Sequence, residues 1–183
     1  MSRWTLACPT ACGLCRFLTL NFSFFLFTTG VLGVNNNNFS GTIRDGFNNW
    51  TTLDFADFSA NQFTGTLPST IFDIPTIRIL YFNGNRLTGT LPANWGNSPS
   101  LRDLFLSGNG LSGTIPDIDP GQLQNLNEFL VEENQFSGSM PASVCALRGV
   151  GGGNLEDLWA DCSNSANPRL ECDVPECCTL CFP

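Results

Sequence analysis

The sequence contains no histidine, few charged residues and few basic ones. Without histidine it lacks the Ser-His-Asp and Cys-His pairs of many hydrolases and the usual proton carrier near neutral pH. Charged residues make up 13% of the 183 residues, and the formal net charge is −8. Surfaces that bind nucleic acid or anionic lipid need clustered lysine and arginine. We therefore predict no enzymatic activity, no cofactor or metal, and no nucleic-acid partner.

A short motif recurs along the chain at a nearly constant interval. Each copy reads asparagine, a variable residue, Phe or Leu, Ser or Thr, glycine, Ser or Thr, and an apolar residue. The copies begin at Asn37, Asn61, Asn85, Asn109 and Asn134, so the intervals are 24, 24, 24 and 25 residues. Self-similarity at a fixed period of this length is the signature of a solenoid.

Apolar residues precede each of the last four asparagines at eight, five and three positions. Spacing of this kind predicts a short strand with one face inward, and stacked copies form a parallel sheet. The asparagine side chain carries both a donor and an acceptor, so stacked copies can satisfy buried backbone groups as a ladder. These positions are expected to build the coil and not to bind a ligand. The apolar triplets are Leu53/Ala56/Phe58, Ile77/Leu80/Phe82, Leu101/Leu104/Leu106 and Leu126/Phe129/Val131.

The repeat resembles the plant-type leucine-rich repeat of receptor ectodomains and polygalacturonase-inhibiting proteins, over about residues 29–163. The resemblance implies an α/β-type repeat solenoid of about five right-handed coils. It also implies a parallel concave β-sheet, an irregular or 3-10 convex side and a disulfide-bonded C-terminal cap. The one extra residue of the fourth interval is expected in residues 117–121, as a bulge that leaves the sheet intact.

Cysteines are confined to the two ends of the chain. Cys8, Cys12 and Cys15 lie at the N-terminus, and six more lie in or near the tail of residues 162–183, which has lost the repeat. This tail resembles the cysteine-rich caps of extracellular leucine-rich repeat proteins, so we expect structural disulfides, whose pairing stays open. The Cys-x-x-Cys spacings leave a metal or redox site as alternatives. The six cysteines are Cys145, Cys162, Cys172, Cys177, Cys178 and Cys181.

Residues 1–30 are predicted to be a targeting segment ahead of the repeats of residues 31–161. An uncharged, largely apolar stretch from Phe17 to Val34 follows two arginines, as in a signal peptide. A membrane anchor and a truncated or wrongly started array remain alternatives. We therefore expect a secreted or cell-surface protein, with possible membrane association through this segment. Asn38 and Asn49 lie in sequons and are candidate glycosylation sites.

The concave face is the predicted binding surface, because side chains between the core positions of each strand point outward there. Aromatic side chains beside charged ones suit a protein, peptide or polysaccharide ligand. We therefore predict an extracellular interaction module, and the sequence does not determine its oligomeric state. The alternative is a structural cell-surface or matrix protein without a specific ligand. Ice binding is a remote alternative, suggested by a predicted hydroxyl ladder of Thr42, Thr66, Thr90, Thr114 and Ser139. The binding candidates are Asp57, Tyr81, Phe105 and Leu130 in a central exposed column, with Arg78, Arg102, Glu128 and Asp54 beside it.

Overall fold

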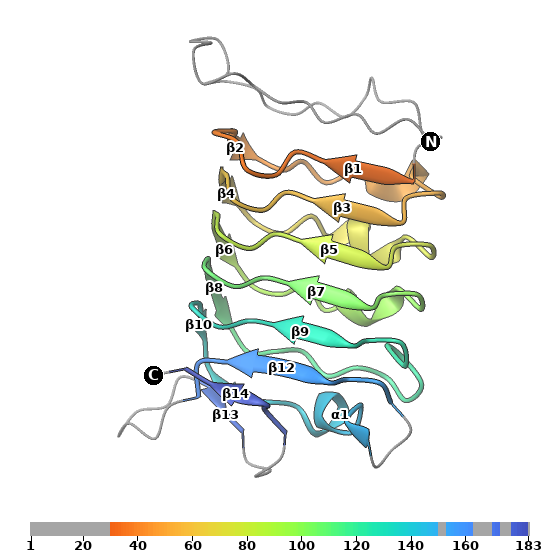
Figure 1. The fold of residues 1–183 in the computed structure, drawn as a ribbon, viewed down its shortest axis with the longest axis vertical. Helices are drawn as coiled ribbons and strands as arrows, with labels where there is room; N and C mark the ends of the chain where they lie inside the picture. The colour runs from red at the N-terminus through yellow and green to blue at the C-terminus, as the bar shows by residue number, and fades with distance from the viewer. Residues whose placement is uncertain (1–29, 150–152, 163–169, 173–176, 183) are drawn as a thin grey trace.

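The computed structural model of the protein describes residues 30–149, 153–162, 170–172 and 177–182. These residues form a stack of coils, and each coil adds one strand to a long parallel sheet, here called the main sheet (Figure 1). Its spatial order is β1 (Val31–Gly33), β3 (Phe55–Asp57), β5 (Ile79–Tyr81), β7 (Asp103–Phe105), β9 (Glu128–Leu130), β12 (Asp157–Ala160) and β14 (Leu180–Cys181).

A second parallel sheet runs along the stack and a few helical turns complete the coils (Figure 1). The expected leucine-rich repeat solenoid, with 3-10 turns opposite the main sheet, is therefore confirmed. Residues 117–121 leave the main sheet intact, because β7 and β9 still pair in register. The second sheet contains β2 (Ser40–Thr42), β4 (Gln62–Gly65), β6 (Arg86–Gly89), β8 (Gly110–Gly113) and β10 (Gln135–Phe136); the helical turns are η3 (Phe47–Asn49), η4 (Ser69–Asp73), η5 (Trp95–Asn97) and α1 (Ala142–Cys145).

The core consists of the apolar positions that the repeat predicts. All four predicted triplets are at most 1% exposed to solvent. Aromatic residues of successive coils stack directly, as Phe58 and Phe82 do with ring centroids 5.1 Å apart. Because each fully buried side chain of this size contributes about 1.5–3 kcal/mol, stacking of coils supplies the stability that no single repeat could reach.

The predicted asparagine ladder is present. From Asn61 to Asn134, the side-chain oxygen of each repeat asparagine accepts from a backbone N–H of the preceding coil, as Asn85 Oδ1 does from Phe63 at 3.0 Å. The amide group of Asn85 donates to the carbonyls of Phe58 and Phe82, both at 3.0 Å. The Phe58 carbonyl also accepts from Asn61, and the Phe82 carbonyl also accepts from Asn109. Successive asparagines therefore share carbonyls and link the coils.

The glycine of each of the last four motifs makes room for a threonine of the preceding coil. Gly65 has a φ of +82°, and a Cβ built there would lie 2.8 Å from Thr42 Cγ2. Gly89 repeats the arrangement, with a φ of +84° and the same 2.8 Å from Thr66 Cγ2. The Thr-Gly-Thr pattern is thus explained by packing between coils, since a larger residue than glycine would meet the threonine methyl group.

Three disulfides tie the C-terminal cap together. They join Cys145 to Cys177, Cys162 to Cys181, and Cys172 to Cys178. The expectation of structural disulfides is confirmed, and the pairing that the sequence left open is settled. The two cysteines of the Cys178-x-x-Cys181 spacing pair with different partners, so the alternative of a redox or metal pair at that spacing is wrong. Cys8, Cys12 and Cys15 lie outside the described residues, as does nearly all of the predicted targeting segment.

The last repeat strand and the cap continue the main sheet. β12 pairs with β9 in the register of the earlier strands, with Leu158 opposite Phe129, and β14 then adds to β12. In a separate pair, β13 (Leu170–Glu171) joins β11 (Gly138–Ser139). The cap therefore covers the end of the array by extending its strands and by fixing them with disulfides. The division of the chain at residues 30 and 161 stays a prediction.

Candidate ligand-binding face

Two columns of side chains form the surface of the main sheet that faces away from the core, here called the outer face. Side chains alternate along each three-residue strand, so the first and third residues point outward and the middle one is buried. The parallel register aligns them from coil to coil. The acidic column contains Phe55, Ile79, Asp103, Glu128 and Asp157, and the aromatic column contains Asp57, Tyr81, Phe105, Leu130 and Trp159.

A row of rings, here called the ring row, extends from Phe55 of the acidic column to Tyr81 and Phe105 of the aromatic column. Tyr81 and Phe105 stack with their centroids 4.4 Å apart, and Phe55 packs edge-on against Tyr81 at 5.7 Å. Tyr81 and Phe105 are half-buried and keep part of each ring open to solvent. The predicted pair of exposed aromatic residues therefore lies together on the outer face.

Two residues of the predicted exposed column are buried, and this part of the expectation is wrong. Asp57 is 8% exposed because its Oδ1 turns back to accept from the backbone N–H and the hydroxyl of Ser59, at 2.9 and 2.6 Å. Leu130 is 9% exposed because Phe105 and Trp159 flank it in register. Both residues support the column, and the open surface belongs to the rings beside them.

Carboxylates crowd the C-terminal half of the acidic column. Asp103 is 7% exposed, and its Oδ1 has no hydrogen-bond partner within the described residues. Burial raises the pKa of Asp103, against the nearby positive charge of Arg102, whose Nε lies 3.6 Å from that oxygen. Burial also raises the pKa of Glu128, and the charges of Asp103 and Asp157 raise it further. The side chains in this region therefore carry unbalanced negative charge.

The same charges act on the aromatic row. Burial raises the pKa of Tyr81, and the carboxylates of Asp103 and Glu128 raise it further. At neutral pH the Tyr81 hydroxyl is thus a neutral hydrogen-bonding group beside acidic ones. The outer face combines flat rings and carboxylates within one small area.

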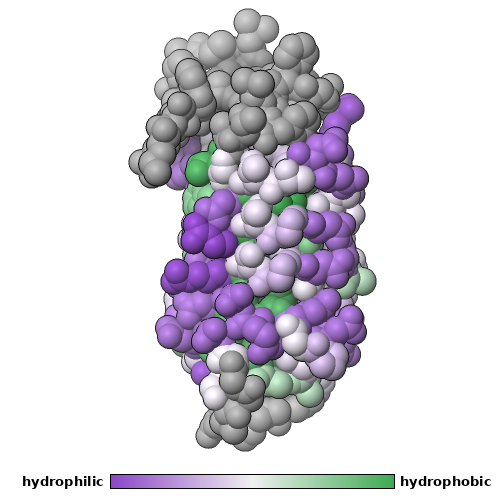
Figure 2. All heavy atoms as spheres, turned by 90° about the vertical axis from the view of Figure 1, so that its right-hand side faces the viewer, coloured by the Kyte–Doolittle hydropathy of each residue, from purple (hydrophilic) through white to green (hydrophobic). Residues whose placement is uncertain are grey.

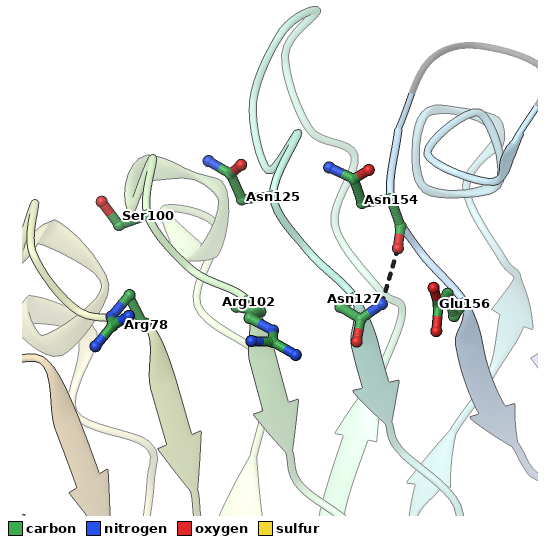
Figure 3. A pocket seen from close by; sticks show the side chains of 7 residues that line it. All are labelled: Arg78, Ser100, Arg102, Asn125, Asn127, Asn154 and Glu156. Carbon is green, nitrogen blue, oxygen red and sulfur yellow. Dashed lines mark hydrogen bonds between the residues drawn. The ribbon is translucent and has the colours of Figure 1, made fainter.

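A polar groove of about 520 Å³ runs along the edge where the strands of the main sheet begin (Figure 3). Arg78, Arg102, Asn127 and Glu156 occupy equivalent positions, each one residue before its strand. The loops that lead into β7, β9 and β12 supply Ser100, Asn125 and Asn154. Hydrophilic residues dominate this side of the stack along its length (Figure 2). The groove offers many hydrogen-bond donors and acceptors and little apolar surface.

The two predicted arginines of the groove differ in their pairing. The guanidinium group of Arg78 forms a bidentate ion pair with Asp54, and its hydrogen bond holds the pKa of Asp54 below the usual range. Arg102 contacts the buried Asp103, and its side chain is 61% exposed. Four predicted site residues, Arg78, Arg102, Glu128 and Asp54, therefore do lie near the aromatic row. The two arginine side chains are about equally exposed, at 62% and 61%, and differ only in how they are paired.

Several features of the site were missing from the sequence prediction. Asp157 and Glu156 continue the rows of Glu128 and Asn127, and aligning β12 with the earlier strands would have found them. No sequence pattern indicates that the side-chain amides of Asn125 and Asn154 belong to the site, because their position beside the groove depends on the path of the loops. Asn127 donates to the Asn154 carbonyl at 3.1 Å across this groove.

The other predicted surfaces lie away from the outer face. Asn38 and Asn49 are exposed, as glycosylation requires, and both stay candidate sites. All five residues of the predicted hydroxyl ladder are exposed at or just after the strands of the second sheet and β11, and ice binding there stays a prediction. The described residues contain no helix long and apolar enough to cross a membrane. In the same ranges, the only group of side chains close enough together to hold a metal ion is formed by the sulfurs of Cys162, Cys172 and Cys178. All three sulfurs belong to disulfides.

The comparisons with known proteins agree with the fold. The sequence profile of the Leucine Rich Repeat family matches residues 76–98 and 100–120. No curated protein sequence matches the chain. The main similarities are to solved structures of plant receptor ectodomains, and three disulfides are typical of such extracellular proteins.

Two of these structures were solved as complexes. The chain is 35% identical, with a TM-score of 0.64, to the ectodomain of the receptor kinase GASSHO1/SCHENGEN3 from Arabidopsis thaliana, solved with CASPARIAN STRIP INTEGRITY FACTOR 2; the match covers 71% of this chain and 15% of that one. It is 26% identical, with a TM-score of 0.60, to the Arabidopsis receptor kinase HAESA, solved with the peptide hormone IDA and the co-receptor SERK1; the match covers 71% and 21%. The chain thus spans a small part of these receptors.

A third solved structure is a plant ice-binding protein. The chain is 22% identical to it, with a TM-score of 0.60, and the match covers 73% of this chain and 41% of that one. At this identity the similarity is one of fold.

Proposed function

We propose that this leucine-rich repeat protein is an extracellular binding module, without catalytic activity, that holds a protein or peptide ligand on the outer face of its main sheet. The observation that supports this proposal is the row of half-buried rings, Phe55, Tyr81 and Phe105, on the same face as carboxylates and a polar groove. Aromatic residues with one open face are typical anchors of protein interfaces. The similar receptor kinase HAESA was solved with a peptide hormone, and the similar RGFR1 is a plant peptide hormone receptor solved with RGF2, which supports the same class of ligand here.

The groove suits the backbone of an extended peptide. Its amide side chains, from Asn125, Asn127 and Asn154, each offer a donor and an acceptor, as peptide groups require. Tyr81 and Phe105 lie across the acidic column from the groove and can take a side chain of the same segment. Hydrogen bonds to the backbone would supply general affinity, and the rings would select among sequences.

The test is a selection of random linear peptides displayed on their encoding nucleic acid against the immobilised full chain. We expect enriched peptides whose binding is lost in the variant Tyr81→Thr plus Phe105→Thr. Threonine favours strands, so the variant should fold, which circular dichroism and urea denaturation would check. The matched control is Val31→Ala plus Leu180→Ala, which trims the exposed apolar residues at the two ends of the same sheet.

The outcomes separate a binding module from a structural protein. Peptides that bind the control variant and not the threonine variant support the proposal. If no peptide binds the unaltered chain better than the threonine variant, the outer face does not bind peptides, and the alternative of a structural protein without a specific ligand is favoured. The proposed extracellular location is tested by expression in a eukaryotic secretory host, where release or surface display with the three disulfides formed is expected. A chain retained in the cytosol with free thiols would contradict it.

A further inference from the structure

The acidic column holds more negative charge than folding alone would favour. Asp103, Glu128 and Asp157 lie opposite one another on β7, β9 and β12. Neighbouring strands are about 4.8 Å apart, and like charges directly opposite on a sheet are unfavourable. The arginine nearest to Asp103 is Arg102, which is largely exposed. A cation from outside the chain would relieve this repulsion.

The environment of Asp103 indicates where that cation would lie. Its side chain is 10% exposed, and Oδ1 has no hydrogen-bond partner among the described residues. Buried polar atoms nearly always have a hydrogen bond. This oxygen has only the longer ion pair with the exposed Arg102, whose Nε lies 3.6 Å away, so it can accept from a further cationic donor. Burial raises the pKa of this group, which fits a carboxylate that lacks a strong hydrogen bond.

The rings beside Asp103 offer a second interaction for a cation. Phe105 follows Asp103 by two residues on the same strand, so the two side chains leave the same face about 6.7 Å apart. Phe105 stacks on Tyr81, and each ring keeps part of its surface open. A lysine or arginine side chain binds well when its apolar stem lies on aromatic rings and its charge meets carboxylates.

We propose that the ligand is a basic peptide segment, with a lysine or arginine that lies on Tyr81 and Phe105 and pairs with Asp103 and Glu128. This inference rests on the proposed function and names the ligand class of the same site. A bare metal ion fits the site less well. In the described ranges, the carboxylates do not bring three oxygens within 4.8 Å of one another, as a preformed metal set would.

The first test uses the same peptide selection and asks what the enriched peptides contain. We expect lysine and arginine in excess over the starting library. The variant Asp103→Asn plus Glu128→Gln should bind those peptides about tenfold more weakly, which is about 1.4 kcal/mol. The control Asp119→Asn plus Glu171→Gln makes the same change in net charge at exposed positions outside the main sheet and should bind as the unaltered chain does.

A carbodiimide cross-linking experiment locates the cation. The sequence contains no lysine, so its side chains offer no amine to link to its own carboxylates. With a selected lysine peptide, we expect links to Asp103, Glu128 or Asp157, read by peptide mass spectrometry. The links should fall when Tyr81 and Phe105 are replaced by threonine.

The results distinguish this inference from the proposed function. Peptides without excess basic residues that still depend on Tyr81 and Phe105 overturn the inference and leave the proposed function standing. Basic peptides that bind both carboxylate variants equally also overturn it, because net charge would then explain the selection. If no peptide depends on the ring row, the proposed function fails and the inference fails with it.

Discussion

Replacing Asn85 with alanine tests how the asparagine ladder stabilises the solenoid. The substitution removes the acceptor of the Phe63 backbone N–H and both donations of the Asn85 amide. The Phe58 and Phe82 carbonyls each keep one donor, from Asn61 and Asn109. The main cost is therefore one buried N–H that loses this acceptor, and not three hydrogen bonds.

A buried N–H without an acceptor costs about 1–3 kcal/mol, so we expect a loss of about 2 kcal/mol in the free energy of unfolding. In a domain of this size that corresponds to a fall in Tm of about 4–8 °C. Urea denaturation, followed by circular dichroism, measures the change. The control Asn125→Ala removes one exposed amide that donates to the Pro99 carbonyl at 3.0 Å, and it should change stability by less than about 0.5 kcal/mol.

The substitution Asn85→Asp sharpens the test. One carboxylate oxygen can still accept from Phe63, but the other would face the Phe58 and Phe82 carbonyls without a proton to donate. At pH 7 this variant should be less stable than Asn85→Ala. The pKa of the introduced carboxyl group would be higher in the folded state than the unfolded value of about 3.9, so stability should rise as the pH falls toward that value. Equal costs for Asn85→Ala and Asn125→Ala, or an aspartate variant as stable as the native chain at pH 7, would refute the ladder argument.

Three further predictions concern packing, charge and the cap. Gly65→Ala should lower the free energy of unfolding, measured by urea denaturation, by about 1–3 kcal/mol, because Gly65 has a positive φ and the new Cβ would lie 2.8 Å from a threonine methyl group. The control Gly33→Ala should be nearly neutral, because its Cβ would meet nothing closer than 3.8 Å. Burial raises the pKa of Asp103 and Glu128 in the folded state, so stability should increase as the pH falls through those raised values toward the ordinary carboxyl range. The variant Asp103→Asn plus Glu128→Gln should lose this increase. A stability curve that falls steadily with acidification from neutral pH would contradict the prediction. Replacing both cysteines of the disulfide between α1 and the cap with serine should lower stability by about 2–4 kcal/mol, measured by thermal unfolding, and an unchanged Tm would show that this bond does not hold the cap.

The fold could be predicted from the sequence because its signals are local and repeated. The offset of each apolar triplet from its asparagine determines which side chains enter the core, and the structure buries all four triplets. The same offsets place Tyr81 and Phe105 outward on neighbouring strands, so their meeting on one face also followed from the sequence. Each of these statements needs only the strand period and the repeat length.

The details of the site depended on contacts that no local pattern contains. Asp57 belongs to the outward column, but a hydrogen bond to Ser59 folds its side chain down. The packing around Asp103 leaves one of its oxygens without a hydrogen bond, and the groove needs loops from three coils.

The repeat itself was thus determined by the sequence alone, since a fixed period imposes the same strand, turn and ladder on every coil. The tertiary structure decided the disulfide pairing, the depth of each outward side chain and the meeting of rings with crowded carboxylates. These depend on distances between residues far apart in the chain, which a linear pattern does not encode.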